Sequence, residues 1–132
     1  MSISEPSLLS IKETPIHPDL SATYSSLGIA ETTATSMRKA IAAIKKQPFD
    51  FIVCEFMYRY GSDYAGCTLS NLDVMLTSLQ KYSPDARVIA LVDKTEQQYI
   101  DKLTEHFPLH AALVYPVNRE TMQQALSYIK GV

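Results

Sequence analysis

The chain has 132 residues, 46% of them hydrophobic and 20% charged, a composition that fits one globular domain with a core of useful size. Twelve basic and fourteen acidic side chains give a formal charge of -2, which implies no overall attraction to nucleic acid or to an anionic membrane. No apolar run approaches the roughly 18 to 20 residues of a membrane span, and no signal-peptide pattern opens the chain. We therefore expect a cytoplasmic protein that forms a single domain over residues 1–132, with a disordered tail at 1–6.

Strand-like and helix-like stretches alternate along the first third of the chain. The apolar run Ser7–Ile11 predicts a first strand, and apolar residues at helical spacing predict a helix over 18–27 that Gly28 ends. Residues 29–33 form a weak second strand, and 35–46 a strongly amphipathic helix with lysines at its C-terminal end.

The stretch 49–56, "FDFIVCEF", predicts a third strand that is apolar enough to be covered on both faces, as strands of parallel sheets usually are. Cys54 acts there as a small hydrophobic residue, and its spacing from Cys67 matches no metal site. The strand ends on Glu55, a carboxylate that is costly to bury without a partner. This strand end is therefore expected to face water, a cation or a ligand.

The same alternation continues to the end of the chain, with a capping residue before most helices. The predicted elements are a helix over 70–82 with Ser70 as N-cap, a strand over Arg87–Val92, a helix over 95–107 capped by Thr95, a strand over 110–117 stopped by Pro116, and a helix over 119–131 capped by Asn118.

Five strands alternating with five helices predict an α/β fold with a doubly wound parallel sheet, because parallel strands need right-handed crossover connections. In such sheets ligands bind beyond the carboxyl ends of the strands. Glu13, Glu55, Val92 and Tyr115 each close a predicted strand, so we expect the functional site among them.

Over essentially its whole length the chain resembles the receiver domains of two-component response regulators. The order of the elements, the apolar third strand after a helix, and Tyr115-Pro116 at the end of the fifth strand carry the resemblance. It implies a CheY-like, flavodoxin-like fold, with a five-stranded sheet in the order 2-1-3-4-5 sandwiched by five helices.

The positions that correspond to the receiver's phosphorylation site differ from the family pattern in all but one residue. Receivers carry an acid pair after the first strand, an aspartate ending the third, Thr or Ser ending the fourth, and Lys-Pro ending the fifth, with an aromatic switch residue before the lysine. The corresponding residues here, together with Met57 beside them, are Lys12 and Glu13 for the acid pair, Glu55 for the aspartate, Val92 for the hydroxyl residue, Tyr115 and Pro116 for Lys-Pro, and Ala112 for the switch residue.

These replacements remove the chemistry of phosphotransfer. Magnesium wants about six oxygen ligands, and the ammonium of Lys12 competes for its place. Glu55 extends the carboxylate by about 1.5 Å, in a site where a misplacement of about 1 Å costs on the order of a hundredfold. Val92 cannot supply the hydroxyl, and Tyr115 cannot supply the cation, that would hold a phosphoryl group. The sequence therefore indicates a degenerate receiver, or pseudo-receiver, that is no enzyme and needs no cofactor, with Mg²⁺ only if the site is active after all.

Glu55 and Tyr115 each allow two interpretations. Glu55 is either a built-in negative charge that imitates the phosphorylated state or a strand-end acid held by Lys12 in a salt bridge. The ring of Tyr115 is expected to cover the former pocket. Its bond to Pro116 is either cis, as in the family's Lys-Pro, or trans, as in most X-Pro bonds.

The connection 56–71 is longer than its counterpart in receivers and is rich in residue types found at binding hot spots. It is either a recognition loop or a loop that folds over the vacated pocket and buries its own tyrosines. The residues in question are Tyr58, Arg59, Tyr60 and Tyr64. The three histidines, His17, His106 and His110, show no metal-binding spacing and are expected at the surface or at helix ends.

We expect a signalling module of a two-component system that works by protein contact, without membrane association or direct nucleic-acid binding. By analogy with receivers, a protein partner or a second copy docks on the face made by the fourth helix, the fifth strand and the fifth helix. That face draws on Gln97, Gln98, Asp101, Lys102, Arg119 and Gln123.

Two alternatives remain. The first is a working receiver that accepts phosphate on Asp50, Glu55 or Asp63. The second is a flavodoxin-like module that binds a small ligand in an apolar pocket near Tyr115.

Overall fold

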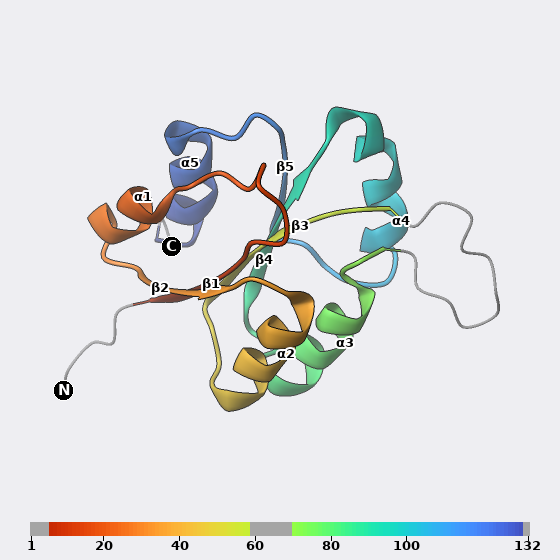
Figure 1. Ribbon diagram of the computed structural model, residues 1–132, viewed down its shortest axis with the longest axis horizontal. Helices are drawn as coiled ribbons and strands as arrows, with labels where there is room; N and C mark the ends of the chain where they lie inside the picture. The colour runs from red at the N-terminus through yellow and green to blue at the C-terminus, as the bar shows by residue number, and fades with distance from the viewer. Residues whose placement is uncertain (1–5, 59–69, 131–132) are drawn as a thin grey trace.

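The computed structural model describes residues 6–58 and 70–130, with the backbone alone for 127–130. Figure 1 shows the strands as a central layer with helices on both sides. The elements in chain order are β1 (Ser7–Ile11), α1 (Ser21–Ser26), β2 (Ala30–Ala34), α2 (Met37–Lys46), β3 (Phe51–Glu55), α3 (Asp73–Tyr82), β4 (Arg87–Val92), the 3₁₀-helix η1 (Lys94–Tyr99), α4 (Ile100–Thr104), β5 (Ala111–Val114) and α5 (Arg119–Lys130).

The five strands form one parallel sheet in the order β2-β1-β3-β4-β5, which confirms the predicted topology. All five residues of β3 are buried, and so are the last five of β4, because helices cover both faces of these central strands. All strands point the same way, so the segments that follow them meet at one edge of the sheet.

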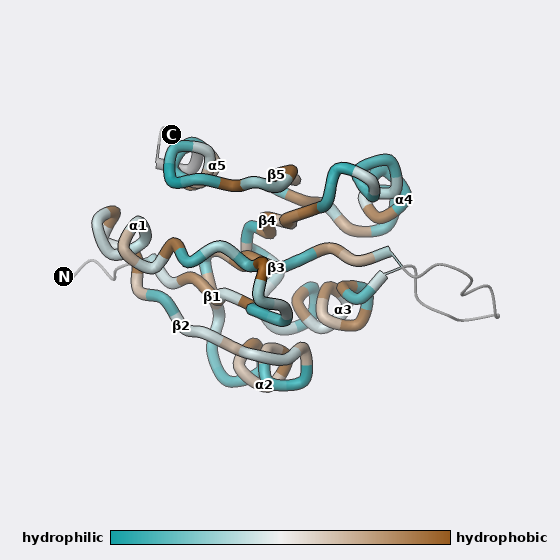
Figure 2. Tube along the Cα trace, turned by 45° about the horizontal axis from the view of Figure 1, so that its top comes forward, coloured by the Kyte–Doolittle hydropathy of each residue, from teal (hydrophilic) through white to brown (hydrophobic). Residues whose placement is uncertain are grey.

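The core has two halves, one on each face of the sheet. On one face α2, α3 and α4 pack against alternate strand residues, including Ile52 and Cys54, both fully buried. On the other face α1 and α5 pack against the intervening residues, including Val53 and Leu91. Figure 2 shows these helices on opposite sides of the sheet, with the more hydrophobic segments turned inward.

Two predicted helices are shorter or tighter than expected. The first covers Ser21–Ser26 and not 18–27, and it ends before Gly28, whose φ of 74° confirms the predicted glycine stop. The helix predicted over 95–107 is split into η1 and the short α4.

The capping residues also differ in part from expectation. Asn118 caps α5, since its side-chain oxygen accepts from the Thr121 amide. Ser70 is not an N-cap of α3; its hydroxyl and its amide both donate to Asp73 one turn later. Thr95 is likewise not a cap, because Asp93 before it accepts from the Thr95 amide. Within the described ranges, no helix has both the length and the apolar character needed to cross a membrane.

Candidate functional site

The Glu55 carboxylate is the centre of a buried hydrogen-bond network at the carboxyl edge of the sheet. The residue ends β3 and is only 2% exposed. The loop after β1 folds over it, and three donors reach Oε2: the amides of Glu13 at 2.9 Å and Thr14 at 3.3 Å, and Nδ1 of His17 at 2.9 Å. The Thr14 hydroxyl donates to Oε1 at 2.6 Å. The carboxylate thus accepts hydrogen bonds on both oxygens, all of them from this one loop.

His17 is the partner of Glu55 that the sequence did not indicate. Its side chain is as well buried as that of Glu55, which corrects the expectation of an ordinary surface histidine. Among the described residues, the side-chain nitrogen beside the Glu55 carboxylate belongs to His17 and not to Lys12, so the predicted salt bridge with Lys12 was wrong. The backbone of Lys12 extends the β1–β2 ladder by donating to Ala34, while its side chain is half-buried.

Burial lowers the pKa of His17 below its usual value, although the hydrogen bond to Glu55 and the negative charge of Glu55 act in the opposite direction. The folded protein then binds a proton at His17 less readily than the unfolded chain does. The stability that the neutral His17 imidazole contributes is complete above its ordinary pKa of about 6.5. It is lost as the pH falls toward the lower pKa that His17 has in the folded protein.

We therefore expect the stability advantage of the wild type over His17→Asn to shrink as the pH falls from neutral to mildly acidic. Asparagine keeps an N–H donor near Glu55 but does not titrate. Urea unfolding of both proteins across this range measures the difference. His106→Asn, at an exposed position, is the matched control and should show no such trend. An advantage that grows on acidification would contradict the assignment.

Asn71 joins the ends of three segments at the same corner. Its Nδ2 donates to Oε1 of Glu13 at 2.8 Å and to the backbone oxygen of Glu55 at 2.7 Å. Its Oδ1 accepts from the Met57 amide at 2.7 Å, and its own amide donates to the Met57 carbonyl at 3.1 Å. The Glu13 carboxylate, which the resemblance to receivers aligns with their acid pair, therefore accepts a hydrogen bond from the side-chain amide of Asn71.

A cleft of about 210 Å³ lies beside the network, between Glu55 and Tyr115. The Tyr115 hydroxyl is buried and has no hydrogen-bond partner among the described residues. Burial, and secondarily the charge of Glu55, raise its pKa. The peptide bond to Pro116 is cis, the first of the two forms considered. Val92 is fully buried in the core, beneath this edge.

Tyr58 connects the end of β3 with η1. Its amide donates to Oε1 of Glu96 at 3.1 Å. Its ring stacks on that of Tyr99, with centroids 3.8 Å apart and an interplanar angle of 5°. The Lys102 ammonium lies 5.7 Å from both ring centroids, within cation–π range.

The other predicted residues lie away from this corner. Asp50 precedes β3 and accepts from the Ser7 amide at the opposite edge of the sheet, so it cannot belong to the site. Asp63, Arg59, Tyr60 and Tyr64 lie outside the described residues. Of the residues predicted for the partner face, Gln97 and Gln98 lie on η1 and are exposed. Asp101, Lys102 and Arg119 are exposed as well, as is Ala112 on β5, while Gln123 is half-buried.

The donor set at this corner is poor in free carboxylate oxygens. Among the side chains that the structure describes, at 6–58 and 70–126, no group of three or more His, Cys, Asp and Glu could hold a metal ion. The sequence missed Thr14, His17 and Asn71, which lie in a loop and at a helix start without periodic pattern. Their one signal was position, because Thr14 and His17 follow the carboxyl end of β1.

No protein-family model matches the sequence, and no curated protein matches it. Solved structures do resemble this one, and several of them are response regulators or receiver domains. The chemotaxis protein CheY4 of Vibrio cholerae is 18% identical with a TM-score of 0.73, covering 96% of this chain and 99% of its own. A response regulator from Thermotoga maritima is 12% identical, with a TM-score of 0.71 and coverage of 98% and 100%.

A third similar structure is the receiver domain of a sensor histidine kinase from Pseudomonas aeruginosa, which has a magnesium ion coordinated in its active-site cleft. It is 18% identical, with a TM-score of 0.70 and coverage of 98% of this chain and 100% of that one. At these identities the similarity establishes the fold. This chain has the CheY-like receiver fold over nearly its whole length.

Proposed function

We propose that this chain is a degenerate receiver of two-component signalling, which regulates through protein contact and without phosphorylation of its own site. The observation that carries the proposal is the environment of Glu55, at the position of the phosphoacceptor. Both carboxylate oxygens accept hydrogen bonds from Thr14, His17 and the backbone of Glu13. An attacking carboxylate oxygen needs a free approach in line with the phosphodonor.

Magnesium does not fit the residues at this corner either. The Glu13 carboxylate accepts a hydrogen bond from Asn71, and the Glu55 carboxylate accepts hydrogen bonds from the loop after β1. The remaining position of the acid pair is occupied by the cationic Lys12. The ion would have to displace several hydrogen bonds to gain its oxygen ligands.

Partner binding is assigned to the face formed by α4, β5 and α5. There β5 carries an exposed Ala112 between helices whose outer residues are polar. Small apolar area within a polar rim suits a protein interface. The partner is either another protein or a second copy of this chain.

The test is treatment with a small phosphodonor and magnesium, followed by intact-mass measurement. We expect no stable increase of about 80 Da, the mass of one phosphoryl group, in the wild type or in Glu55→Gln. A gain in the wild type that Glu55→Gln abolishes would overturn the proposal. Glu55→Asp, which restores the usual residue type, is also expected to remain unmodified. Val92 still provides no hydroxyl at its position, and Tyr115 still provides no cation at the position of the lysine.

The cleft beside Tyr115 supports a second candidate, a small-ligand site. Tyr115, whose buried hydroxyl has no described partner, lines a cleft of about 210 Å³ that also borders Glu55 and Asp93. A ligand that binds there should raise the unfolding temperature of the wild type. Tyr115→Phe, which removes only the hydroxyl, should reduce that shift, and an equal shift in both proteins would place the ligand elsewhere.

A further inference from the structure

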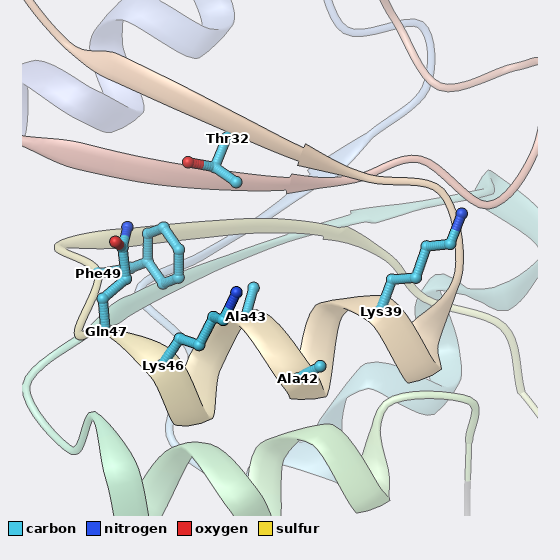
Figure 3. Close-up of a pocket in the computed structure, with 7 residues that line it drawn as sticks. All are labelled: Thr32, Lys39, Ala42, Ala43, Lys46, Gln47 and Phe49. Atoms are coloured by element: carbon cyan, nitrogen blue, oxygen red, sulfur yellow. The ribbon is translucent and has the colours of Figure 1, made fainter.

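Beside β2, the outermost strand on one side of the sheet, lies a groove that the proposed function does not use. It lies between β2 and α2, has a volume of about 340 Å³, and is lined by Thr32 and Phe49 together with residues of α2. Figure 3 shows Lys39 and Lys46 extending from α2 on the side that faces the strands, with Thr32 across the groove. The two lysines are seven residues apart, so they lie on the same face of the helix.

The strand beside this groove is a free edge. In the described part of the chain β2 pairs with β1 alone. The Ala30 amide donates to Pro6 and the Ala34 carbonyl accepts from Lys12, so alternate residues of β2 turn their backbone groups toward β1. The intervening Glu31 and Thr33 therefore present their N–H and C=O groups to the outside.

This edge lacks the usual protection against pairing. Edge strands are commonly guarded by outward charges, prolines or bulges. The single charged residue of β2 is Glu31, and its carboxylate turns inward to accept from Ser10 and Ser21, each at 2.6 Å. The edge can therefore accept a further strand.

The positive charge of α2 favours the addition of an acidic strand at this edge. The helix carries Arg38, Lys39, Lys45 and Lys46 and no acidic residue, in a chain of net charge -2. Among the described residues neither Lys39 nor Lys46 has a carboxylate partner; Lys39 only lies 3.4 Å from the Thr35 hydroxyl. A second copy would bring the same cations against these, which disfavours self-pairing.

We propose that β2 and α2 form a docking site for an extended acidic segment of another protein. The segment adds to the sheet beside β2 and pairs with the backbone of Glu31 and Thr33. Its alternate side chains project over the groove, where carboxylates meet Lys39 and Lys46. The inference is independent of the proposed function, because it concerns the β2 edge of the sheet and not the α4, β5 and α5 face.

The probe is a seven-residue peptide that alternates threonine and glutamate, titrated against the full chain by calorimetry and by amide chemical shifts. We expect saturable binding below about 1 mM, with the largest shifts at Glu31 and Thr33. The double variant Lys39→Glu/Lys46→Glu should weaken binding by about tenfold or more. Lys94→Glu, an exposed lysine on η1 far along the sheet, is the matched control and should change it little.

A second variant separates strand pairing from simple charge attraction. Thr33→Pro removes an outward N–H without removing a bond to β1, a position where an edge strand tolerates proline. It should abolish peptide binding while circular dichroism confirms an intact fold. The proposal is overturned if no saturable binding occurs, if Thr33→Pro or a peptide with a central proline binds as well as its parent, or if Lys94→Glu weakens binding as much as the double variant. Self-association that Thr33→Pro abolishes would likewise overturn it in favour of a second copy.

Discussion

Replacing Glu55 by alanine should lower the free energy of unfolding by about 3 to 5 kcal/mol, because each buried donor left without its acceptor costs about 1 to 3 kcal/mol. The substitution leaves the Thr14 hydroxyl, the amides of Glu13 and Thr14, and the His17 imidazole without their acceptor in a buried corner. It also leaves a cavity where the side chain stood. Chemical denaturation at neutral pH measures the loss.

The size of the loss should depend on how much of the acceptor remains. Glu55→Gln retains one carbonyl oxygen and should cost about 1 to 2 kcal/mol. Glu120→Ala removes an exposed acid from α5 and should stay within about 0.5 kcal/mol of the wild type. If Glu55→Ala were no more harmful than Glu120→Ala, the network would not hold the loop after β1.

Asn71→Ala should cost about 2 kcal/mol, because it leaves the Met57 amide and the Glu55 carbonyl without partners in a partly buried corner. Asn71→Asp tests the direction of the bonds. It keeps the acceptor for Met57 but brings a carboxylate against the oxygens of Glu13 and Glu55, where the amide now donates. We expect Asn71→Asp to be destabilising at neutral pH and to recover partly in acid, where a protonated aspartate can donate.

Asn118→Asp provides the matched comparison. Asn118 caps α5 through its side-chain oxygen, a role that aspartate fills equally well, so this change should be nearly neutral. Equal effects of Asn71→Asp and Asn118→Asp in urea unfolding would count against the role of Asn71 as a donor.

The sequence predicted the fold because most of its strands, β2 excepted, are short and largely apolar. It placed Glu55 at the carboxyl edge because parallel strands end at a common edge. β1 and β4 have the predicted limits, since both stretches, Ser7–Ile11 and Arg87–Val92, consist mainly of apolar residues. Helix limits were less accurate where local bonds compete. Asp93 holds the Thr95 amide, and the turn that follows is 3₁₀ in place of the predicted α-helix.

The partners of Glu55 could not be predicted in the same way. Lys12 was the expected partner because it is a cation that directly follows β1, at the same edge of the sheet as Glu55. The observed partner is His17, which the loop after β1 brings back over the Glu55 carboxylate. Loop paths depend on backbone hydrogen bonds and burial, and they leave no periodic pattern in the sequence. Asn71 was missed for the same reason, since its partners are 14 and 16 positions away at Met57 and Glu55.

The stacked rings of Tyr58 and Tyr99 give this protein an optical reporter of its own. The chain contains no tryptophan, so tyrosine emission and near-ultraviolet dichroism are not masked. Two parallel phenol rings with centroids 3.8 Å apart couple their transitions, and that coupling depends on how the chain after β3 sits against η1. Events at the adjoining α4 surface can therefore be followed spectroscopically without attaching a dye.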